Sequence, residues 1–384
     1  MMFAKEEQER IPEELAKIFK KLEQDVFDDI IRRISASKDI SRTTDYEMYR
    51  LSQLRTYDYS LKERIKLALR ESTETIDSMF EKVIEEGYAH DKRLYEDAGI
   101  PFVPLDENPV ILQLTKAVKE ATKGDIENMS QTIGFIKETA GGTKFEEATT
   151  YFRNKLNETM VTMATGTYSY DTTLKKTVTE LCNSGIRTVS YESGRHERVD
   201  VAVRRATLTG LAKITGKIAE QNAEALKTDY FEVSAHSTAR PSHMLWQGRV
   251  YTKEQLKTIC GLGEVTGLCG ANCYHHYDAF IPGVSKRAYT DEQLNKMYKD
   301  SLISKEFNGK KYTLYEATQY QRALERSMRV QDEKIKLLKL GNGSSEDLMI
   351  VRMRRRNTYE TYKKLSKEFG LPEHMSRVFT SERQ

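Results

Sequence analysis

The sequence predicts a mainly α fold, with long N-terminal helices, one small α+β module near the centre and further helices at the C-terminal end. Apolar residues recur at a spacing of three or four over most of the chain, which is the spacing of one helix face. Only 38% of the 384 residues are apolar and 31% are charged, as expected for long helices with wide water-facing sides. Between residues 228 and 290 the pattern changes to short strand-like runs and glycine turns.

The N-terminal helical region covers residues 1–140. Apolar residues from Ile11 to Ile31 predict a first helix, and a longer apolar stripe after Ser41 predicts a second. We expect Gly87 to stop the second helix, because glycine accepts the left-handed conformation that follows a helix end. The remaining features of this region are a break at 99–104, a helix over 108–135 and a turn at Gly141-Gly142.

Two further helical regions flank the module. The first, 141–227, leads into it, with helices expected over 144–186, interrupted at 166–170, and over 199–226, and with a loop around Gly194. The second is the C-terminal helical region, 291–384. Its apolar stripe from Ala317 to Leu338 predicts a helix that ends at Gly341-Asn342-Gly343, before a last helix that begins at Ser344 or Ser345 and runs to Gly370.

The module at 228–290 concentrates the unusual residues of the chain. It holds three of the four cysteines, the only tryptophan and four of the seven histidines. Tyr230–Ala235 is strand-like, and Pro241 suits the first position of a short helix. Two helix starts in or beside the module fit a capping box, Thr252 with Gln255 and Thr290 with Gln293.

Composition excludes several classes of protein. No stretch approaches the roughly 20 apolar residues of a membrane-spanning helix, so we expect no membrane association. The first 30 residues are charged throughout, which argues against a secretory signal and predicts a soluble protein made inside the cell. Four cysteines do not make a disulfide scaffold. No GxxxxGK[ST] loop occurs, so an ATP-driven motor is not predicted.

Four residues of the module are candidate zinc ligands. His236, His243, Cys273 and His275 supply imidazole and thiol groups, spaced H-x6-H and C-x-H. The C-x-H pair suits a strand, where alternate residues share a face, but the H-x6-H spacing is loose and no CxxC is present. The alternative is a hydrogen-bonded polar knot that holds the module together, and we expect no cofactor on that interpretation. Cys260 and Cys269 are further possible ligands, but are expected to pack as small buried groups.

The same residues could also carry catalysis. Cys273 beside His275 or His243 could act as a nucleophile, but no catalytic-cysteine signature surrounds it. The run His275-His276-Tyr277-Asp278 would suit a metal-dependent hydrolase or nuclease with a histidine base, but a full constellation is missing. We therefore expect no enzymatic activity, with metal-dependent hydrolysis as the alternative.

Positive charge is concentrated near the C-terminal end. Residues 321–384 carry 15 Lys/Arg and 9 Asp/Glu, a net charge of +6, so the remainder is −3 against a total of +3. The run Arg354-Arg355-Arg356 is a candidate contact for the phosphate backbone of DNA, binding that would be salt-dependent and independent of sequence. A solvated helix face is the simpler interpretation of the same charges.

A family resemblance rests on three strings: SAHSTARPSHMLWQGRVY, GLCGANCYHHYDAFIPGVSKRAYT and YTLYEATQYQRALER. They resemble the phage minor capsid protein 2 family of tailed phages and prophages of low-GC Gram-positive bacteria. The module is similar to the head-morphogenesis domain named after the phage Mu F protein (MuF-like), although Tyr274 stands where that domain usually has arginine. The matching positions are Ala239, Arg240, Pro241, His243, Trp246, Gln247, Gly248, Asn272, Cys273 and His275.

The resemblance implies a structural protein of the virion that acts near the portal during head morphogenesis. Its partners would be the portal protein, the major capsid or scaffold proteins and, through the arginine run, packaged DNA. The long helices would make the protein–protein contacts. Ala239, Arg240, Pro241, Trp246, Gln247, Gly248 and Asn272 would have a structural role, holding the loops of the module.

Overall fold

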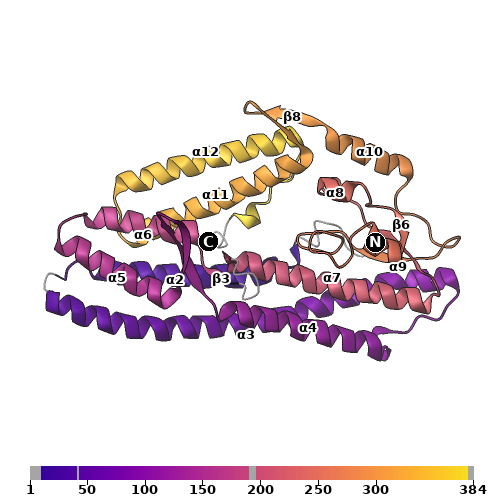
Figure 1. Cartoon of the computed structure of the whole chain (residues 1–384), viewed down its shortest axis with the longest axis horizontal. Coiled ribbons are helices and arrows are strands. Elements are labelled where there is room, and N and C mark those ends of the chain that lie inside the picture. Colours follow the sequence, from indigo (N-terminus) through magenta and orange to yellow (C-terminus); the bar gives the residue numbers. More distant parts are fainter. Residues whose placement is uncertain (1–9, 41–42, 190–195, 379–384) are drawn as a thin grey trace. The chain divides into compact units, whose positions relative to one another are not determined.

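The computed structural model describes residues 10–40, 43–189 and 196–378 (Figure 1). The chain is 67% helical, and its described residues form 11 α-helices and a few small antiparallel sheets. The predicted mainly α fold with a small α+β module is therefore confirmed. No helix in the described ranges is long and apolar enough to cross a membrane. The loop predicted around Gly194 lies outside the described residues.

The chain divides into two compact units, and each unit draws on three separate segments. Unit 1 contains the described residues within Met1–Leu15, Thr73–Ile126 and Val203–Gln319. Unit 2 contains those within Ala16–Ser72, Glu127–Ala202 and Tyr320–Gln384. The chain passes between the units several times, and one of these boundaries, between Ser72 and Thr73, falls inside a helix. Helix α3 (Thr43–Ala98) contributes its first half to unit 2 and its second half to unit 1.

Unit 2 packs helices around a four-stranded antiparallel sheet of order β2-β1-β3-β4. Two aromatic stacks form part of its core, Phe135 on Tyr151 at 4.4 Å and Tyr57 on Phe152 at 4.1 Å between ring centroids. Its strands are β1 (Gly134–Thr139), β2 (Gly142–Glu147), β3 (Arg187–Val189) and β4 (His196–Arg198). Its helices are most of α2 (Glu13–Ala36), α5 (Ala148–Ala164), α6 (Tyr170–Ser184), most of α11 (Leu314–Leu340), α12 (Ser345–Phe369) and the short η2 (Met375–Arg377).

Helices α11 and α12 lie side by side as a hairpin within unit 2 (Figure 1). Gln331 on α11 donates to Thr358 on α12 at 3.0 Å, and Gln321 donates to Ser366 at 2.9 Å. The turn at Gly341-Asn342-Gly343 ends α11 as predicted, and Ser344 caps the start of α12 by accepting from the Asp347 amide. Gly370, with φ 63°, ends α12 at the predicted residue.

Unit 1 contains the predicted module, whose sheet has the order β6-β5-β7. Its strands are β5 (Tyr230–Val233), β6 (Val250–Thr252), β7 (Tyr277–Phe280) and a separate hairpin of β8 (Ser304–Phe307) and β9 (Lys310–Thr313). Its helices are most of α4 (Pro109–Ser130) and α7 (Val199–Ala225), the short α8 (Pro241–Met244), α9 (Lys253–Thr258) and η1 (Leu105–Glu107), and α10 (Asp291–Leu302). Both predicted capping boxes are confirmed, at α9 and at α10.

One hydrophobic core joins the module to two long helices of unit 1. Phe231, Trp246 and Tyr277 of the module are buried together with Tyr95 of α3 and Ala219 of α7. Tyr95 also donates its hydroxyl to the Asn222 side chain at 2.9 Å. The sheet therefore packs against α7, which directly precedes it in the chain, and against α3, which lies far away in the sequence.

The prediction that Gly87 stops the second helix is wrong. Helix α3 continues through Gly87 to Ala98 and ends at Gly99, which has φ 66°. A glycine inside a helix costs about 1 kcal/mol relative to alanine. The apolar face continues past it, with Tyr88 and Tyr95 each at most 5% exposed, so tertiary burial outweighs that cost.

The helix predicted over 108–135 is also too long. Helix α4 ends at Ser130, and residues 134–147 form the β1–β2 hairpin, with Thr139 opposite Gly142 at the predicted turn. The hairpin is held by a partner far along the chain, because Gly134 pairs with Arg187 of β3. Such a long-range pairing leaves no local signal. The β8–β9 hairpin was likewise not predicted, although its Asn308-Gly309 turn is a strong local indication of a hairpin.

Candidate functional site

His243 is held in place by the short helix α8. Arg240 is the extended residue before the helix and Pro241 occupies its first turn, as predicted. The backbone amide of His243 donates to the Arg240 carbonyl at 2.9 Å. The His243 ring lies against Trp246, with ring centroids 4.4 Å apart, so the hydrophobic core fixes its position.

Cys273 and His275 come from the loop that leads into β7. Two residues of this loop, Cys269 with φ 60° and Asn272 with φ 55°, adopt the left-handed conformation that side chains rarely tolerate. A Cβ on Gly270 would clash with the Val265 carbonyl, so the loop is tightly wound at that point. The amide of His276 donates to the Ser234 side chain at 3.0 Å, which anchors the loop to the sheet.

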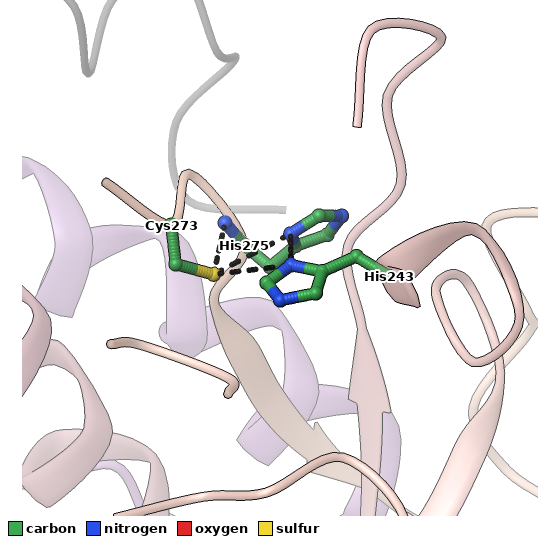
Figure 2. A group of neighbouring side chains, drawn as sticks. All are labelled: His243, Cys273 and His275. Atoms are coloured by element: carbon green, nitrogen blue, oxygen red, sulfur yellow. Dashed lines mark hydrogen bonds between the residues drawn. The ribbon is translucent and has the colours of Figure 1, made fainter. Parts of the chain in front are cut away.

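The three side chains converge on one point (Figure 2). The Nδ1 atoms of His243 and His275 are 3.3 Å apart. The Sγ of Cys273 lies 3.8 Å from Nδ1 of His243 and 3.5 Å from Nδ1 of His275. All three atoms can donate an electron pair to a metal ion, and they lie within 4.8 Å of one another.

The outer nitrogens of the two rings show where their protons are. Nε2 of His243 lies 2.9 Å from the Thr266 carbonyl oxygen, which can only accept. Nε2 of His275 lies 2.9 Å from Oε1 of Gln247, and that oxygen also accepts from the His236 amide at 3.0 Å. Both Nε2 atoms must therefore carry hydrogen. In the neutral rings both Nδ1 atoms then present lone pairs to each other and to the thiol.

Burial keeps this cluster uncharged. His243 is 2% exposed, His275 3% and Cys273 9%. Burial lowers the pKa of His243, and it lowers the pKa of His275 well below the usual value, with nearby His236 adding to the effect. Burial raises the pKa of Cys273, partly opposed by the His275 amide, which donates to its sulfur at 3.4 Å. A raised thiol pKa is the opposite of what activates a catalytic cysteine.

The fourth candidate ligand, His236, lies next to the three but not among the converging atoms. Its ring stacks on His275 with centroids 4.5 Å apart. Arg240, predicted to hold loops, donates Nη2 to the Ala271 carbonyl at 2.7 Å and Nη1 to the Thr266 carbonyl at 3.4 Å. Arg240 and His243 thus both bind the Thr266 carbonyl, which ties the 266–271 segment to α8.

The other motif residues surround the cluster. Trp246 packs on both histidine rings, and Gln247 donates to the sulfur atoms of Met244 and Met297 while its oxygen accepts from His275. Gly248 has φ 70°, and a Cβ there would clash with Leu294. Ala239 is 2% exposed, in a turn closed by the His236 carbonyl. Cys260 lies in the hydrophobic core, and Cys269 donates its thiol to the His275 carbonyl oxygen at 3.6 Å.

The run that suggested a nuclease is mostly buried. His275, His276 and Tyr277 are at most 7% exposed, and His276 Nε2 lies 3.7 Å from an Asp278 oxygen. Catalytic metal sites keep a position open to substrate, whereas structural sites are closed. The enclosed position of this cluster favours a structural role.

The arginine run on α12 does not form one patch, because consecutive helix residues point in different directions. Arg355 pairs with Asp332 at 2.8 Å. Arg354 lines a hollow of about 470 Å³ between α6, α11 and α12, which Arg326 and Lys334 also line. Arg356 is exposed and does not line that hollow. The hollow is therefore lined by three cationic side chains. Of these, only Arg354 belongs to the arginine run that the sequence indicated.

Sequence reasoning missed a second polar cluster, partly buried in unit 2. Arg198 binds Glu23 at 2.5 Å and Asp200 at 3.4 Å, and Arg329 binds Asp200 at 3.1 Å. Glu23 also accepts from the Ile186 amide at 2.6 Å. Glu23 and Arg198 are 175 residues apart, so no local pattern could have indicated the pair.

The family model of phage minor capsid protein 2 matches residues 4–365, nearly the whole chain. The match includes the module with its histidine and cysteine cluster, the helical region before it and most of the C-terminal helical region. No curated protein and no solved structure matches the chain. The predicted family is confirmed, and the chain belongs to the phage minor capsid protein 2 family.

Proposed function

We propose that this protein is a structural minor component of the phage head that binds next to the portal and acts in head morphogenesis. The observation that carries the proposal is the family match over residues 4–365. Membership of a capsid-protein family implies contacts with other head components. We propose that the specific partners are the portal protein and the major capsid or scaffold proteins.

An exposed apolar stripe on α3 supports protein–protein contact. Met48, Leu51 and Tyr59 are 69%, 61% and 70% exposed. Their spacing of three and eight residues places them on one face of the helix, since 3.6 residues make one turn. Large exposed apolar side chains that share a face are typical of surfaces that bind a partner.

The test is incorporation into heads. The double change Met48→Lys and Leu51→Lys should leave the melting temperature unchanged, because both side chains are exposed. It should reduce the amount of protein that co-sediments with procapsids at least tenfold. Lys62→Gln on the same helix is the matched control and should have no effect, since its side chain is 67% exposed and polar. Loss of the whole protein without any change in head assembly would contradict the proposal.

We infer a second, DNA-binding role from the cationic hollow of unit 2. Its lining includes Arg326, Lys334 and Arg354 but no carboxylate among the described residues. Burial lowers the pKa of Lys334, and nearby Arg354 lowers it further, because the cations repel one another. An anion such as a backbone phosphate would relieve this repulsion. The inferred ligand is packaged DNA, bound without sequence preference.

Binding to random duplex DNA tests this role. Each phosphate contact contributes a slope of about −0.9 to the dependence of log affinity on log salt. The triple change Arg326→Gln, Lys334→Gln and Arg354→Gln removes three such contacts. It should make the slope less negative by about 2.7. Arg356→Gln on the same helix is the control. An unchanged slope in the triple variant, or no binding by the wild type at low salt, would contradict the role.

A further inference from the structure

The side chains of His243, Cys273 and His275 converge on one point. We propose that they bind one zinc ion through the two Nδ1 atoms and the Cys273 sulfur, and that the ion joins α8 to the loop before β7. The histidine ring of α8 and the two loop ligands are at least 30 residues apart in the sequence. A shared ion would therefore fix the two halves of the module to each other.

The main argument is an imbalance between protons and lone pairs. The Thr266 carbonyl and the Gln247 oxygen require both Nε2 atoms to carry hydrogen, so both Nδ1 atoms are acceptors. These acceptors face each other at 3.3 Å. The Cys273 thiol has one proton and can satisfy only one of them. A cation at the point of convergence satisfies both nitrogens and the sulfur at once.

The chemistry of the donors selects zinc. Two imidazole nitrogens and one thiolate are ligands that zinc prefers, whereas calcium and magnesium prefer oxygen. Zinc binds the thiolate, so binding releases the Cys273 proton to solvent. The three protein ligands leave the fourth position of a tetrahedron to a water molecule, and the burial of the three side chains keeps substrates away from that position.

The groups around the three ligands are arranged as in a metal site. Metal-binding histidines usually donate their other ring nitrogen to a carbonyl or carboxylate, which fixes the tautomer and orients the ring. His243 does so to Thr266 and His275 to Gln247. Gln247 is held in turn by the His236 amide and by two methionine sulfur atoms. The amide of His275 donates to the Cys273 sulfur at 3.4 Å, which favours its thiolate form.

Backbone strain in the loop supports the same conclusion. Cys269 and Asn272 both have positive φ, and Asn272 directly precedes Cys273. Each such residue costs about 1–3 kcal/mol and persists where the surroundings require it. The Cys273 side chain, which follows this turn, points its sulfur toward the two rings (Figure 2).

Metal content of the full-length protein is the first measurement. We expect about one zinc per chain after purification without added metal, and uptake of one zinc by protein stripped with a chelator. Replacement of zinc by cobalt(II) should give a sulfur-to-cobalt charge-transfer band and the visible bands of a tetrahedral ion. Absence of zinc uptake, or cobalt binding without a sulfur band, overturns the proposal even if no variant folds.

The variants use a matched pair of buried cysteines from the same module. Cys273→Ala should abolish the sulfur band and reduce zinc content at least tenfold. Cys260→Ala should leave both unchanged, because Cys260 is 1% exposed in the hydrophobic core. Gln247→Leu should weaken zinc binding by roughly 10- to 100-fold, the usual effect of losing an outer partner. Equal zinc content in Cys273→Ala and the wild type contradicts the site.

Discussion

Each unit holds a polar cluster, partly buried in unit 2 and buried in unit 1, and the clusters differ in how their charges and hydrogens balance. In unit 2, Arg198 and Arg329 face Glu23 and Asp200, so two positive groups meet two negative ones. In unit 1, His243, Cys273 and His275 present three electron-pair donors and a single shared proton. The charges of the first cluster are paired within the chain, and the proposed zinc ion would complete the second.

The pKa values of Asp200 and of the two histidines differ in the same way, although burial raises the pKa of Glu23 above its usual value. Burial raises the pKa of Asp200, but Arg198 and Arg329 outweigh it, and the net pKa lies below the usual value. Asp200 is thus held ionised. Burial instead lowers the pKa of both histidines of unit 1, so they stay neutral and keep their lone pairs. Burial of polar side chains therefore does not by itself identify a ligand site. The distinguishing feature of unit 1 is the lone pairs on the two histidine Nδ1 atoms that no hydrogen-bond donor fully satisfies.

The largest expected effect is the loss of an arginine from the unit 2 cluster. Arg198→Met leaves Glu23 without its closest positive partner. Breaking a fully buried pair costs about 3–5 kcal/mol, which is the upper limit for this partly buried one. Chemical denaturation measures this change in the free energy of unfolding. Arg287→Met is the control, because its pair with Asp291 is exposed and such pairs contribute little to stability. Similar losses in the two variants would show that the cluster is not essential to unit 2.

Removal of zinc should have the next largest effect, and only through unit 1. At free zinc 1,000 times Kd, binding stabilises the folded chain by ~4 kcal/mol. The wild type should therefore melt at a lower temperature in chelator than in excess zinc, whereas Cys273→Ala should melt at the same temperature in both. Scanning calorimetry provides the measurement. An equal response of the wild type and Cys273→Ala would contradict the comparison.

Asp200 is held ionised by two arginines, whereas the buried carboxylate of Asp91 in unit 1 accepts a hydrogen bond from the neutral side chain of Asn222. Burial, with Asp278 adding to it, raises the pKa of Asp91 to about 7. The folded state therefore holds a proton that the unfolded state loses near pH 4, and stability falls as pH rises from about 4 to 7. Asp91→Asn should remove this loss and stabilise the chain by up to ~4 kcal/mol at pH 8, with little effect near pH 4.

Urea unfolding of Asp91→Asn at several pH values measures this difference. A constant difference between variant and wild type from pH 4 to pH 8 would contradict the raised pKa.

The smallest expected effect comes from the capping boxes. Thr252→Ala removes the side chain that accepts from the Gln255 amide and should cost about 1 kcal/mol. Because the box contains none of the proposed ligands, the cost should be equal in zinc and in chelator. A cost that appears only with zinc would link α9 to the metal site and revise the boundary of that site.

The elements that could be predicted from the sequence are those with local causes. The capping boxes at Thr252 and Thr290, the Pro241 start of α8 and the Gly370 end of α12 depend on residues within one helix turn. Gly87 was misinterpreted because burial of distant residues outweighs its local preference. The β1–β2 hairpin was missed because its sheet is completed by a strand about 50 residues later.

The candidate site could be predicted in its residue types but not in its arrangement. The histidines and cysteines of the module were identifiable from their density, and three of the four candidates converge. The role of His236 and the carbonyl of Thr266 could not be predicted, because they depend on how the 266–271 segment folds over α8. The Glu23–Arg198 pair had no signal at all, since its members lie in distant segments that only the folded unit brings together.

Hydrogen exchange of the full-length protein, measured by mass spectrometry with and without a zinc chelator, tests the comparison most directly. The account predicts faster exchange after chelation in residues 236–248 and 266–280 of unit 1, and unchanged exchange in α2, β4 and α11 of unit 2. Unchanged exchange in both units, or an equal increase in both, would contradict the claim that only the unit 1 cluster is completed by a metal ion.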